Sequence, residues 1–428
     1  MQSKKNKNRI QQELEKSVKS FMNNEAEKAF VSLDNLEKMG IPKNERGNVQ
    51  KVTLLLLAGT FYGIHTLKEL LELYGVKKTR CTKIWRQLSH KQVYDLFVQG
   101  SRQVFQTAFE KLLKQSAASQ SRATMTIVGD DSIFQHWLKE AKNDPFYGKF
   151  FSGQFQKAVF GYCVSLVGVV LNDTFYPLTF SLVSKTDKNK PKDERKQSLV
   201  IMEKSIKEVV SLLGVMAEQI KKELPQLYIS LDNGFNEKKL LDSCEKLKLI
   251  VLFVPGKSEI IHLDNKRMSF SELITTEFLP QEEAFYADTK NKNKSFLLRL
   301  RVFYKKLNRF VTILVFRFNK SRKVTIIFSN DKNIKSKTMR WHFFQRTQIE
   351  QFFRTVKHIL KIRQSKSADE KSFRKKIALF FLKALFAFAF RNFCRNHFRR
   401  FKTFSFYKLK INVIFHNVDK AILADFIV

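Results

Sequence analysis

The sequence is short of cysteine, of long apolar runs and of acidic residues, and each shortage narrows what the chain can be. Its four cysteines, among 428 residues, are far apart and form no Cys-x-x-Cys pair. They predict neither a zinc site nor a disulfide framework, and they fit a reducing compartment. The most apolar run, Ile377 to Phe390, is interrupted by Lys383 and is shorter than the ~20 residues of a membrane span. We interpret it as a buried helix. The first residues are charged and contain no apolar signal core.

The deficit of acids leaves a large positive charge. Lys and Arg number 78 against 40 Asp and Glu, which gives a net charge of +38. Such an excess destabilises a compact fold by self-repulsion unless a polyanion shares the surface. Nucleic acid is therefore the leading partner, and an anionic membrane is second because no long amphipathic helix stands out. With 43% hydrophobic residues and 42 phenylalanines, the chain is expected to fold, into two or three domains.

Residues 1–120 have a helical pattern and are predicted to bind DNA. Thr66 and Glu69 form the Thr-x-x-Glu pattern of a capping box, and the helix that they open is predicted to stop at Gly75. Because a basic helix follows, the outline is that of a helix-turn-helix; an ordinary helical hairpin with solvated lysines is the alternative. The basic residues that would face DNA are Lys77, Lys78, Arg80, Lys83 and Arg86.

Residues 121–256 have the pattern of an α/β fold. Three strands come first, and Asn172-Asp173 joins the second and third as a hairpin. A helix, a strand, a helix and a strand follow. Residues 257–340 break into shorter strands and read as a β-rich insertion. The predicted strands are 124–128, 155–171, 175–183, 227–231, 249–254, 299–304, 310–318 and 324–328, and the helices of the α/β part are 197–223 and 236–246.

A helix predicted over Trp341 to Arg363 carries a single acid, Glu350, on an otherwise basic face. A solvated face would usually mix acids and bases at i,i+4 spacing, so this pattern indicates that a polyanion and a metal meet here. The face consists of Phe343, Arg346, Glu350, Arg354, Lys357 and Lys361. At about 100° per residue, four of them fall within about 60° of one another around the helix axis: Phe343, Arg346, Glu350 and Lys357. Arg354 and Lys361 border these four. The buried side is predicted to consist of Ile349, Phe352, Phe353, Val356 and Leu360.

Further carboxylates follow two predicted strands: Asp130 or Asp131 after the first, and Asp232 after the fourth. Reactive groups gather at strand ends in α/β sheets. If these groups converge with Glu350 they repel, and a divalent cation removes the repulsion. Oxygen ligands suit Mg²⁺ or Mn²⁺, and two such ions about 4 Å apart serve phosphoryl transfer. Taken alone, each aspartate could instead form a turn or a helix cap.

These residues resemble the motifs of DDE transposases of bacterial insertion sequences, in the group marked by a Tyr-(2)-Arg-(3)-Glu-(6)-Lys signature. In this sequence, phenylalanine takes the place of the tyrosine and every spacing matches. Asp130 stands in the place of the first catalytic aspartate, with Asp131 as the alternative, and Asp232 begins an Asp-x-Gly-Phe segment. The resemblance covers residues from about 120 to 365. The signature reads Phe343-(2)-Arg346-(3)-Glu350-(6)-Lys357.

The resemblance implies an α/β protein with an RNase H-like catalytic core (121–256 and 341–369), the β-rich insertion before the last catalytic helix, and flanking helical regions (1–120 and 370–428). It implies that Asp130, Asp232 and Glu350 bind two Mg²⁺ or Mn²⁺ ions. The activity would be cleavage at transposon ends and joining of the 3′-hydroxyls to target DNA. A homodimer on terminal inverted repeats, in the cytoplasm near the nucleoid, would carry it out. A metal-dependent nuclease that cuts without joining, or a domesticated DNA-binding protein, is the alternative.

Overall fold

The computed structural model describes residues 16, 20–62, 78–119, 125–135, 144–152, 157–184, 197–287, 295–317, 324–360, 362 and 369–397. It confirms an α/β fold. The first six strands are β1 (Met125–Gln135), β2 (Tyr147–Ser152), β3 (Lys157–Leu171), β4 (Thr174–Val183), β5 (Leu227–Leu231) and β6 (Ile250–Phe253). The other five are β7 (Ile260–Leu263), β8 (Lys266–Ser269), β9 (Leu297–Tyr304), β10 (Arg309–Arg317) and β11 (Val324–Ser329).

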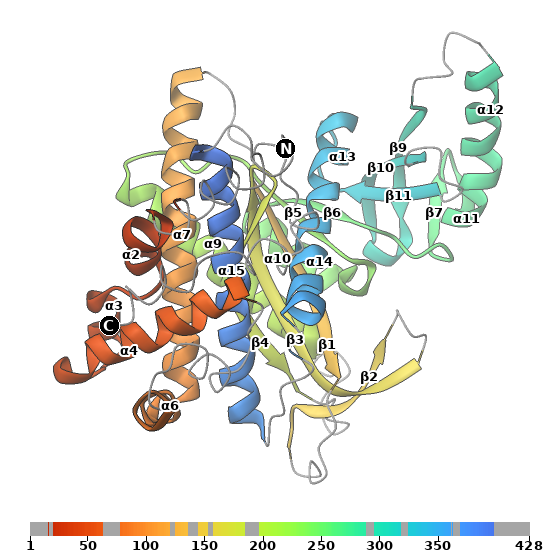
Figure 1. Cartoon of the computed structure of the whole chain (residues 1–428). Coiled ribbons are helices and arrows are strands. Elements are labelled where there is room, and N and C mark those ends of the chain that lie inside the picture. Colours follow the sequence, from red (N-terminus) through yellow and green to blue (C-terminus); the bar gives the residue numbers. More distant parts are fainter. Residues whose placement is uncertain are drawn as a thin grey trace, which may run out of the picture.

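These strands form one mixed sheet of 11 strands with helices on both faces (Figure 1). The order is β2-β3-β1-β5-β6-β11-β10-β9-β7-β8, and β4 pairs with β3. β1, β5 and β6 are parallel to one another, whereas the other pairs are antiparallel. The predicted hairpin between β3 and β4 is confirmed. Its two turn residues, Asn172 and Asp173, both have positive φ (49° and 57°), as the turn that matches strand twist requires.

Alternate residues of β1 point to opposite faces of the sheet, and this decides which helix each one meets. On one face a Cβ at Gly129 would lie 2.5 Å from Sδ of Met202, so the absence of a side chain lets α9 (Gln197–Gln219) pack closely. On the other face Thr126 Oγ1 lies 2.7 Å from Nδ1 of His342, in α13 (Ser336–Gln345). Helices therefore cover both faces at β1, which explains why its first residues are apolar almost without alternation.

The helices next to β5 and β6 follow the same division. α10 (Lys238–Lys246) packs beside α9, and α14 (Thr347–Arg354) continues from α13 over β1. Figure 1 shows α13 and α14 in front of the strands, with α9 and α10 behind them. The two faces are called below the α13–α14 face and the α9–α10 face.

Beside β4, the N-terminal and C-terminal helices pack together into one layer. Phe97, Phe180 and Phe381, from α7, β4 and α15, lie with ring centroids 5.1 to 5.9 Å apart. The run from Ile377 to Phe390 lies in α15 and is buried, as predicted. The flanking regions are thus packed against each other. The helices of this layer are α2 (Glu27–Phe30), α3 (Leu33–Lys38), α4 (Lys43–Ala58), α6 (Lys78–Gln87), α7 (His90–Ser119) and α15 (Glu370–His397).

The region predicted to be an insertion, residues 257–340, continues the same sheet. Its strand β11 pairs with β6, and α13 begins within this range, at Ser336. The region also contains helices, which Figure 1 shows at the outer end of the sheet. Among the described helices, none has the length and apolar character needed to cross a membrane. The helices of the insertion are α11 (Phe270–Leu273), η4 (Ile274–Phe278), α12 (Leu279–Ala287) and η6 (Lys305–Leu307).

The single helix predicted over Trp341 to Arg363 is wrong in its bounds. α13 begins earlier, at Ser336, and the helix is interrupted at Arg346. After α14 it widens into the π-helical turn η7 (Thr355–Ile359). The predicted helix opened by Thr66, and Lys361, lie outside the described residues. The interruption at Arg346 matters for the site, because it separates α13, which packs over β5 and β6, from α14, which packs over β1 and β4 and carries Glu350.

Candidate active site

Asp130 and Asp131 are neighbours in β1 but lie on opposite faces of the sheet. The prediction that β1 ends before them is wrong, because pairing with β3 continues to Gln135. The parallel pairing with β5, however, ends at Gly129 and Leu231. Asp130 is therefore the first residue beyond that pairing on β1, and Asp232 is the first residue after β5. The alternation places Asp130 on the α13–α14 face and Asp131 on the α9–α10 face.

The electrostatics of the two aspartates match this division. Desolvation raises the pKa of Asp130 to about 7, Arg346 opposes the rise, and the Asp232 carboxylate adds to it. Desolvation also raises the pKa of Asp131 to about 6, and there the opposing groups are the hydroxyls of Ser165 and Ser198. Asp130 thus belongs to a cluster of charges, whereas Asp131 faces the hydroxyls of Ser165 in β3 and Ser198 in the first turn of α9.

Arg346 connects the acids of this cluster. Its Nη1 lies 3.3 Å from Oδ1 of Asp232, and its Nη2 lies 3.1 Å from Oε1 of Glu350. The Arg346 side chain is only 17% exposed, against 49% for Asp232 and 43% for Glu350, so the cation is the inner group and the two acids are the outer ones. Arg346 therefore bridges Asp232 and Glu350, and Asp130 interacts electrostatically with Arg346 and with Asp232.

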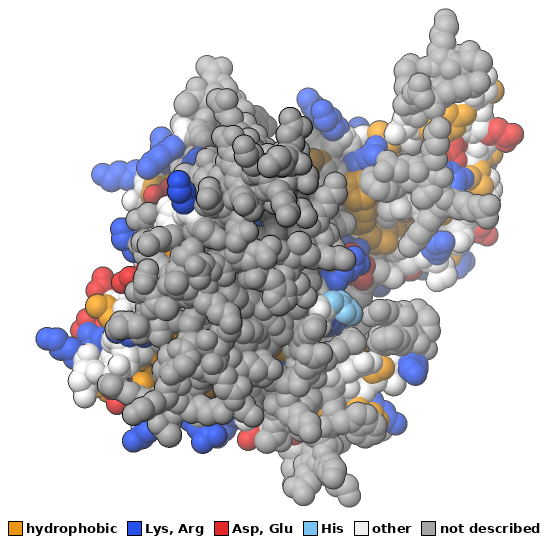
Figure 2. All heavy atoms as spheres, viewed as in Figure 1, with side chains coloured by type: hydrophobic (Ala, Val, Ile, Leu, Met, Phe, Trp, Pro, Cys, Tyr) orange, Lys and Arg blue, Asp and Glu red, His pale blue; other side chains and the backbone are white. Residues whose placement is uncertain are grey.

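α14 is held against the sheet by the side that its spacing predicted. Ile349, Phe352, Phe353, Val356 and Leu360 are all buried, which confirms that prediction. Because this side is fixed, the opposite side of α14 carries Glu350 outward. Figure 2 shows basic and acidic side chains gathered beside α14, where the core meets the insertion.

Two further contacts near the site were not predicted from the sequence. One holds α13 on the sheet, and the other holds the loop that follows β5. His342 is fully buried, stacks on Tyr228 at a centroid distance of 3.5 Å and meets Thr126, so it locks α13 onto β5 and β1. Asn236, four residues after Asp232, donates to Tyr304 Oη (2.7 Å) and thereby ties the loop after β5 to the insertion. The position of His342 between Trp341 and Phe343 could have indicated the first contact from the sequence. No sequence pattern indicates the hydrogen bond between Asn236 and Tyr304.

The predicted DNA-binding residues of the signature region differ in how far their side chains are exposed to solvent. Phe343 is 7% exposed and packs in a cluster with Leu314 and Phe316 of β10. It lies beneath Arg346, whose guanidinium is 6.0 Å from the ring centroid, and its contact with DNA stays a prediction. Arg354 is exposed on α14. Lys357 is half-buried in η7 with Nζ 5.0 Å from the ring centroid of Phe134.

Of the basic residues predicted for the N-terminal helix, Lys83 and Arg86 are exposed on α6. Lys78 and Arg80 fall in the first turn of α6, and Lys77 lies outside the described residues. The helix that would precede the turn of a helix-turn-helix also lies outside them. The helix-turn-helix therefore stays a prediction.

The chemistry of the acidic cluster fits a hard divalent cation. Asp130, Asp232 and Glu350 would supply oxygen ligands, and the raised pKa of Asp130 reflects a burial that a cation would compensate. Within the described residues, no three His, Cys, Asp or Glu side chains are grouped so as to hold a metal ion. The cation that Asp232 and Glu350 share is Arg346. Metal binding at these residues would thus require the guanidinium to move.

Compared with models of known protein families and with curated protein sequences, the chain matches none.

Proposed function

We propose that the protein is a DDE-type DNA transposase that cuts DNA at transposon ends and joins the 3′-hydroxyls to target DNA. The observation that carries this proposal is the grouping of Asp130, Asp232 and Glu350 around Arg346, from three distant parts of the sequence. Strand order supports an RNase H-like core, since three antiparallel strands (β4, β3 and β1) are followed by two parallel ones (β5 and β6) linked through α10.

In this proposal, Asp130, Asp232 and Glu350 hold Mg²⁺ or Mn²⁺. When bound, two such ions would supply a nucleophile at neutral pH and would stabilise the leaving oxygen of the phosphodiester. Asp130 must be ionised to act as a ligand. Burial raises its pKa to about 7, so near neutral pH it would release a proton when the cation binds. Its position beyond the last β1–β5 pair directs it toward Asp232, the first residue after β5.

The basic residues of the same helix position DNA. Arg346, once it leaves Asp232 and Glu350, presents a planar guanidinium that binds a phosphate through two hydrogen bonds. Arg354 and Lys357 follow it along α14 and η7 and hold the same backbone. The N-terminal region binds the terminal inverted repeats, and a homodimer brings two ends together. The place of action is the cytoplasm, at the nucleoid.

Strand transfer from a pre-cut end tests the proposal. A duplex from the DNA that flanks the gene, ending in a free 3′-hydroxyl, is incubated with the full chain, supercoiled plasmid and Mg²⁺ or Mn²⁺. We expect the end to become covalently joined to the plasmid. A nuclease would cut the plasmid and leave the end unjoined. A DNA-binding descendant would bind the end and do neither, and either result would overturn the proposal.

A further inference from the structure

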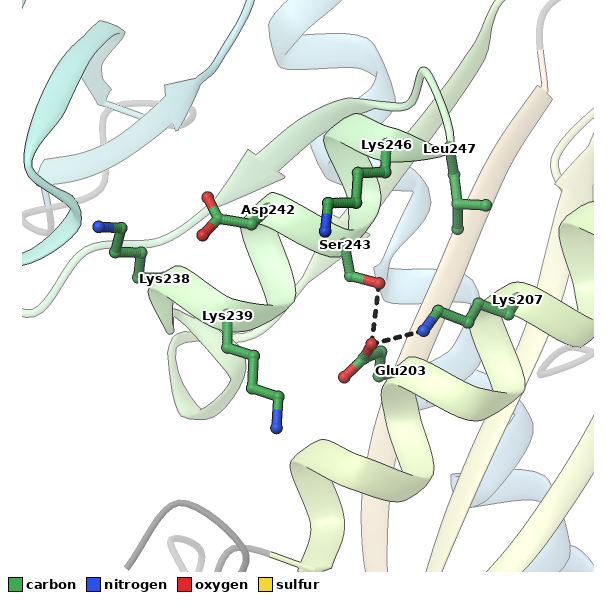
Figure 3. Close-up of a pocket in the computed structure, with 8 residues that line it drawn as sticks. All are labelled: Glu203, Lys207, Lys238, Lys239, Asp242, Ser243, Lys246 and Leu247. Carbon is green, nitrogen blue, oxygen red and sulfur yellow. Dashed lines mark hydrogen bonds and ion pairs between the residues drawn. The ribbon is translucent and has the colours of Figure 1, made fainter.

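The α9–α10 face carries a second cluster of charge, apart from the acidic cluster around Arg346. A hollow of about 520 Å³ lies between α9 and α10. Four lysines line it, Lys207 from α9 and Lys238, Lys239 and Lys246 from α10, against two acids. Lys239 and Lys246 are seven residues apart and therefore share one side of α10. Figure 3 shows Lys207, Lys239 and Lys246 directed toward the space around Glu203, whereas Lys238 points away from it.

Both acids of the hollow are already engaged. Glu203 accepts from Nζ of Lys207 at 2.7 Å and from Oγ of Ser243 at 3.0 Å, as Figure 3 also shows. Asp242 pairs with Arg309 of β10, which does not line the hollow. Within the described part of the chain, the remaining lysines form no ion pair with these acids at 4 Å or less. The hollow thus has an excess of positive charge with exposed ammonium groups.

We propose that this hollow binds the phosphodiester backbone of target DNA, the duplex into which the cut end is joined. This inference rests on the proposed function. Lysine ammonium groups attract phosphate without reading bases, and a contact that ignores sequence suits a target more than a terminal repeat that must be recognised. The hollow lies on the face opposite α14, so it adds a contact to the target duplex at a distance from the carboxylates, where the phosphate that is joined must lie. α10 begins just after the Asp232 loop, which connects the hollow to the edge that carries the carboxylates.

The test compares two double variants that remove the same charge. Lys239→Gln with Lys246→Gln empties the hollow of two cations. Lys204→Gln with Lys222→Gln is the matched control, because both lysines are exposed on or just after α9 and neither lines the hollow. Binding of each full-length variant to a duplex unrelated to the transposon ends is measured across a salt series. We expect the hollow variant alone to lower the slope of log K against log salt by about 2, because each phosphate that a lysine no longer neutralises removes about one unit.

A second measurement separates target binding from end binding. For the hollow variant, the plasmid concentration that gives half-maximal joining of a pre-cut end should rise about tenfold. Cleavage of a transposon end in a single turnover should stay unchanged, and Lys239→Arg with Lys246→Arg should restore joining. Equal behaviour of the hollow and control variants in both assays overturns the inference, as does an equal loss of cleavage and joining. A hollow that binds anionic vesicles or free polyphosphate but not duplex DNA overturns it too.

The failure of the proposed function would look different. If the unmodified protein neither cuts nor joins DNA, the transposase proposal fails. The salt slopes of the two double variants on unrelated duplex then still show whether the hollow binds a DNA backbone.

Discussion

The two faces of the sheet carry opposite arrangements of charge. On the α13–α14 face, one arginine pairs with Asp232 and Glu350 and lowers the negative charge around Asp130; on the α9–α10 face, lysines surround acids that are already paired. Asp130 and Asp131, adjacent in β1, belong to different faces and have different neighbours. The difference shows that the alternation of side chains along β1, and not proximity in the sequence, decides which of the two aspartates lies near Arg346. Four predictions test this division.

The largest expected effect comes from the two neighbouring aspartates. Asp130→Asn should reduce DNA cleavage by about 10³-fold or more, the scale seen when a member of a catalytic unit is removed. Asp131→Asn should leave cleavage within about fivefold, because its carboxylate faces Ser165 and Ser198 on the other side of the sheet. Single-turnover cleavage with Mn²⁺ measures both. The reverse order of effects would move the metal ligand by one residue and the site to the other face.

Most of the fold could be predicted from sequence because its strands and helices carry local signals. The hairpin at Asn172-Asp173 and the buried side of α14 follow from turn chemistry and helical spacing, which depend on nearby residues alone. The length of β1 could not be predicted, since it depends on pairing with β3 up to Gln135. The burial of Phe343 could not be predicted either, because the residues that cover it, such as Phe316, come from the insertion.

The sequence predicts some features of the candidate site and not others. The signature specifies the order and spacing of Arg346, Glu350 and Lys357 without specifying what they touch. Nothing in the sequence indicates that Arg346 bridges Asp232 and Glu350, because the bridge depends on where β5 ends relative to α14. The choice between Asp130 and Asp131 needed the register of β1 with β5, which fixes the pairing end at Gly129.

Lys357 tests whether the α13–α14 face opposes a DNA backbone. Lys357→Ala should weaken productive DNA engagement by about 1–3 kcal/mol, through loss of a charge-assisted hydrogen bond. Metal affinity should change little, since the three carboxylates remain. Lys204→Ala, on exposed α9, is the matched control. Cleavage and strand transfer across a salt series decide the matter. Activity of Lys357→Ala equal to that of the unmodified protein at every salt concentration would mean that this face does not hold DNA.

The buried imidazole of His342 makes its own contribution to stability fall as the pH falls. Burial lowers the pKa of His342 to about 3 from an ordinary value of 6.5. The unfolded chain therefore binds a proton below pH 6.5 that the folded chain takes up only near pH 3. His342 thus costs stability as pH falls between these values, by about 1.4 kcal/mol per unit and about 2 kcal/mol at pH 5.

Denaturant unfolding from pH 7 to 5 measures this effect. His342→Gln should lose that part of the acid sensitivity, whereas His262→Gln, in β7 of the insertion, should keep it. Equal acid sensitivity of the two variants would contradict the role given to His342.

The smallest expected effect concerns Arg346 as the cation that the acids share. Arg346→Gln leaves three carboxylates without their common partner, so the metal-free protein should lose about 1 kcal/mol of stability, a modest value because Asp232 and Glu350 are exposed to solvent. The same change should tighten Mn²⁺ binding, because the ion no longer competes with a guanidinium. Arg354→Gln, which removes the same charge from exposed α14, should do neither. Calorimetric titration of Mn²⁺ without DNA, with thermal melting at several Mn²⁺ concentrations, measures both effects. Weaker Mn²⁺ binding in Arg346→Gln would show that the arginine supports the metal site instead of occupying it, and the contrast between the two faces would then rest on the carboxylates alone.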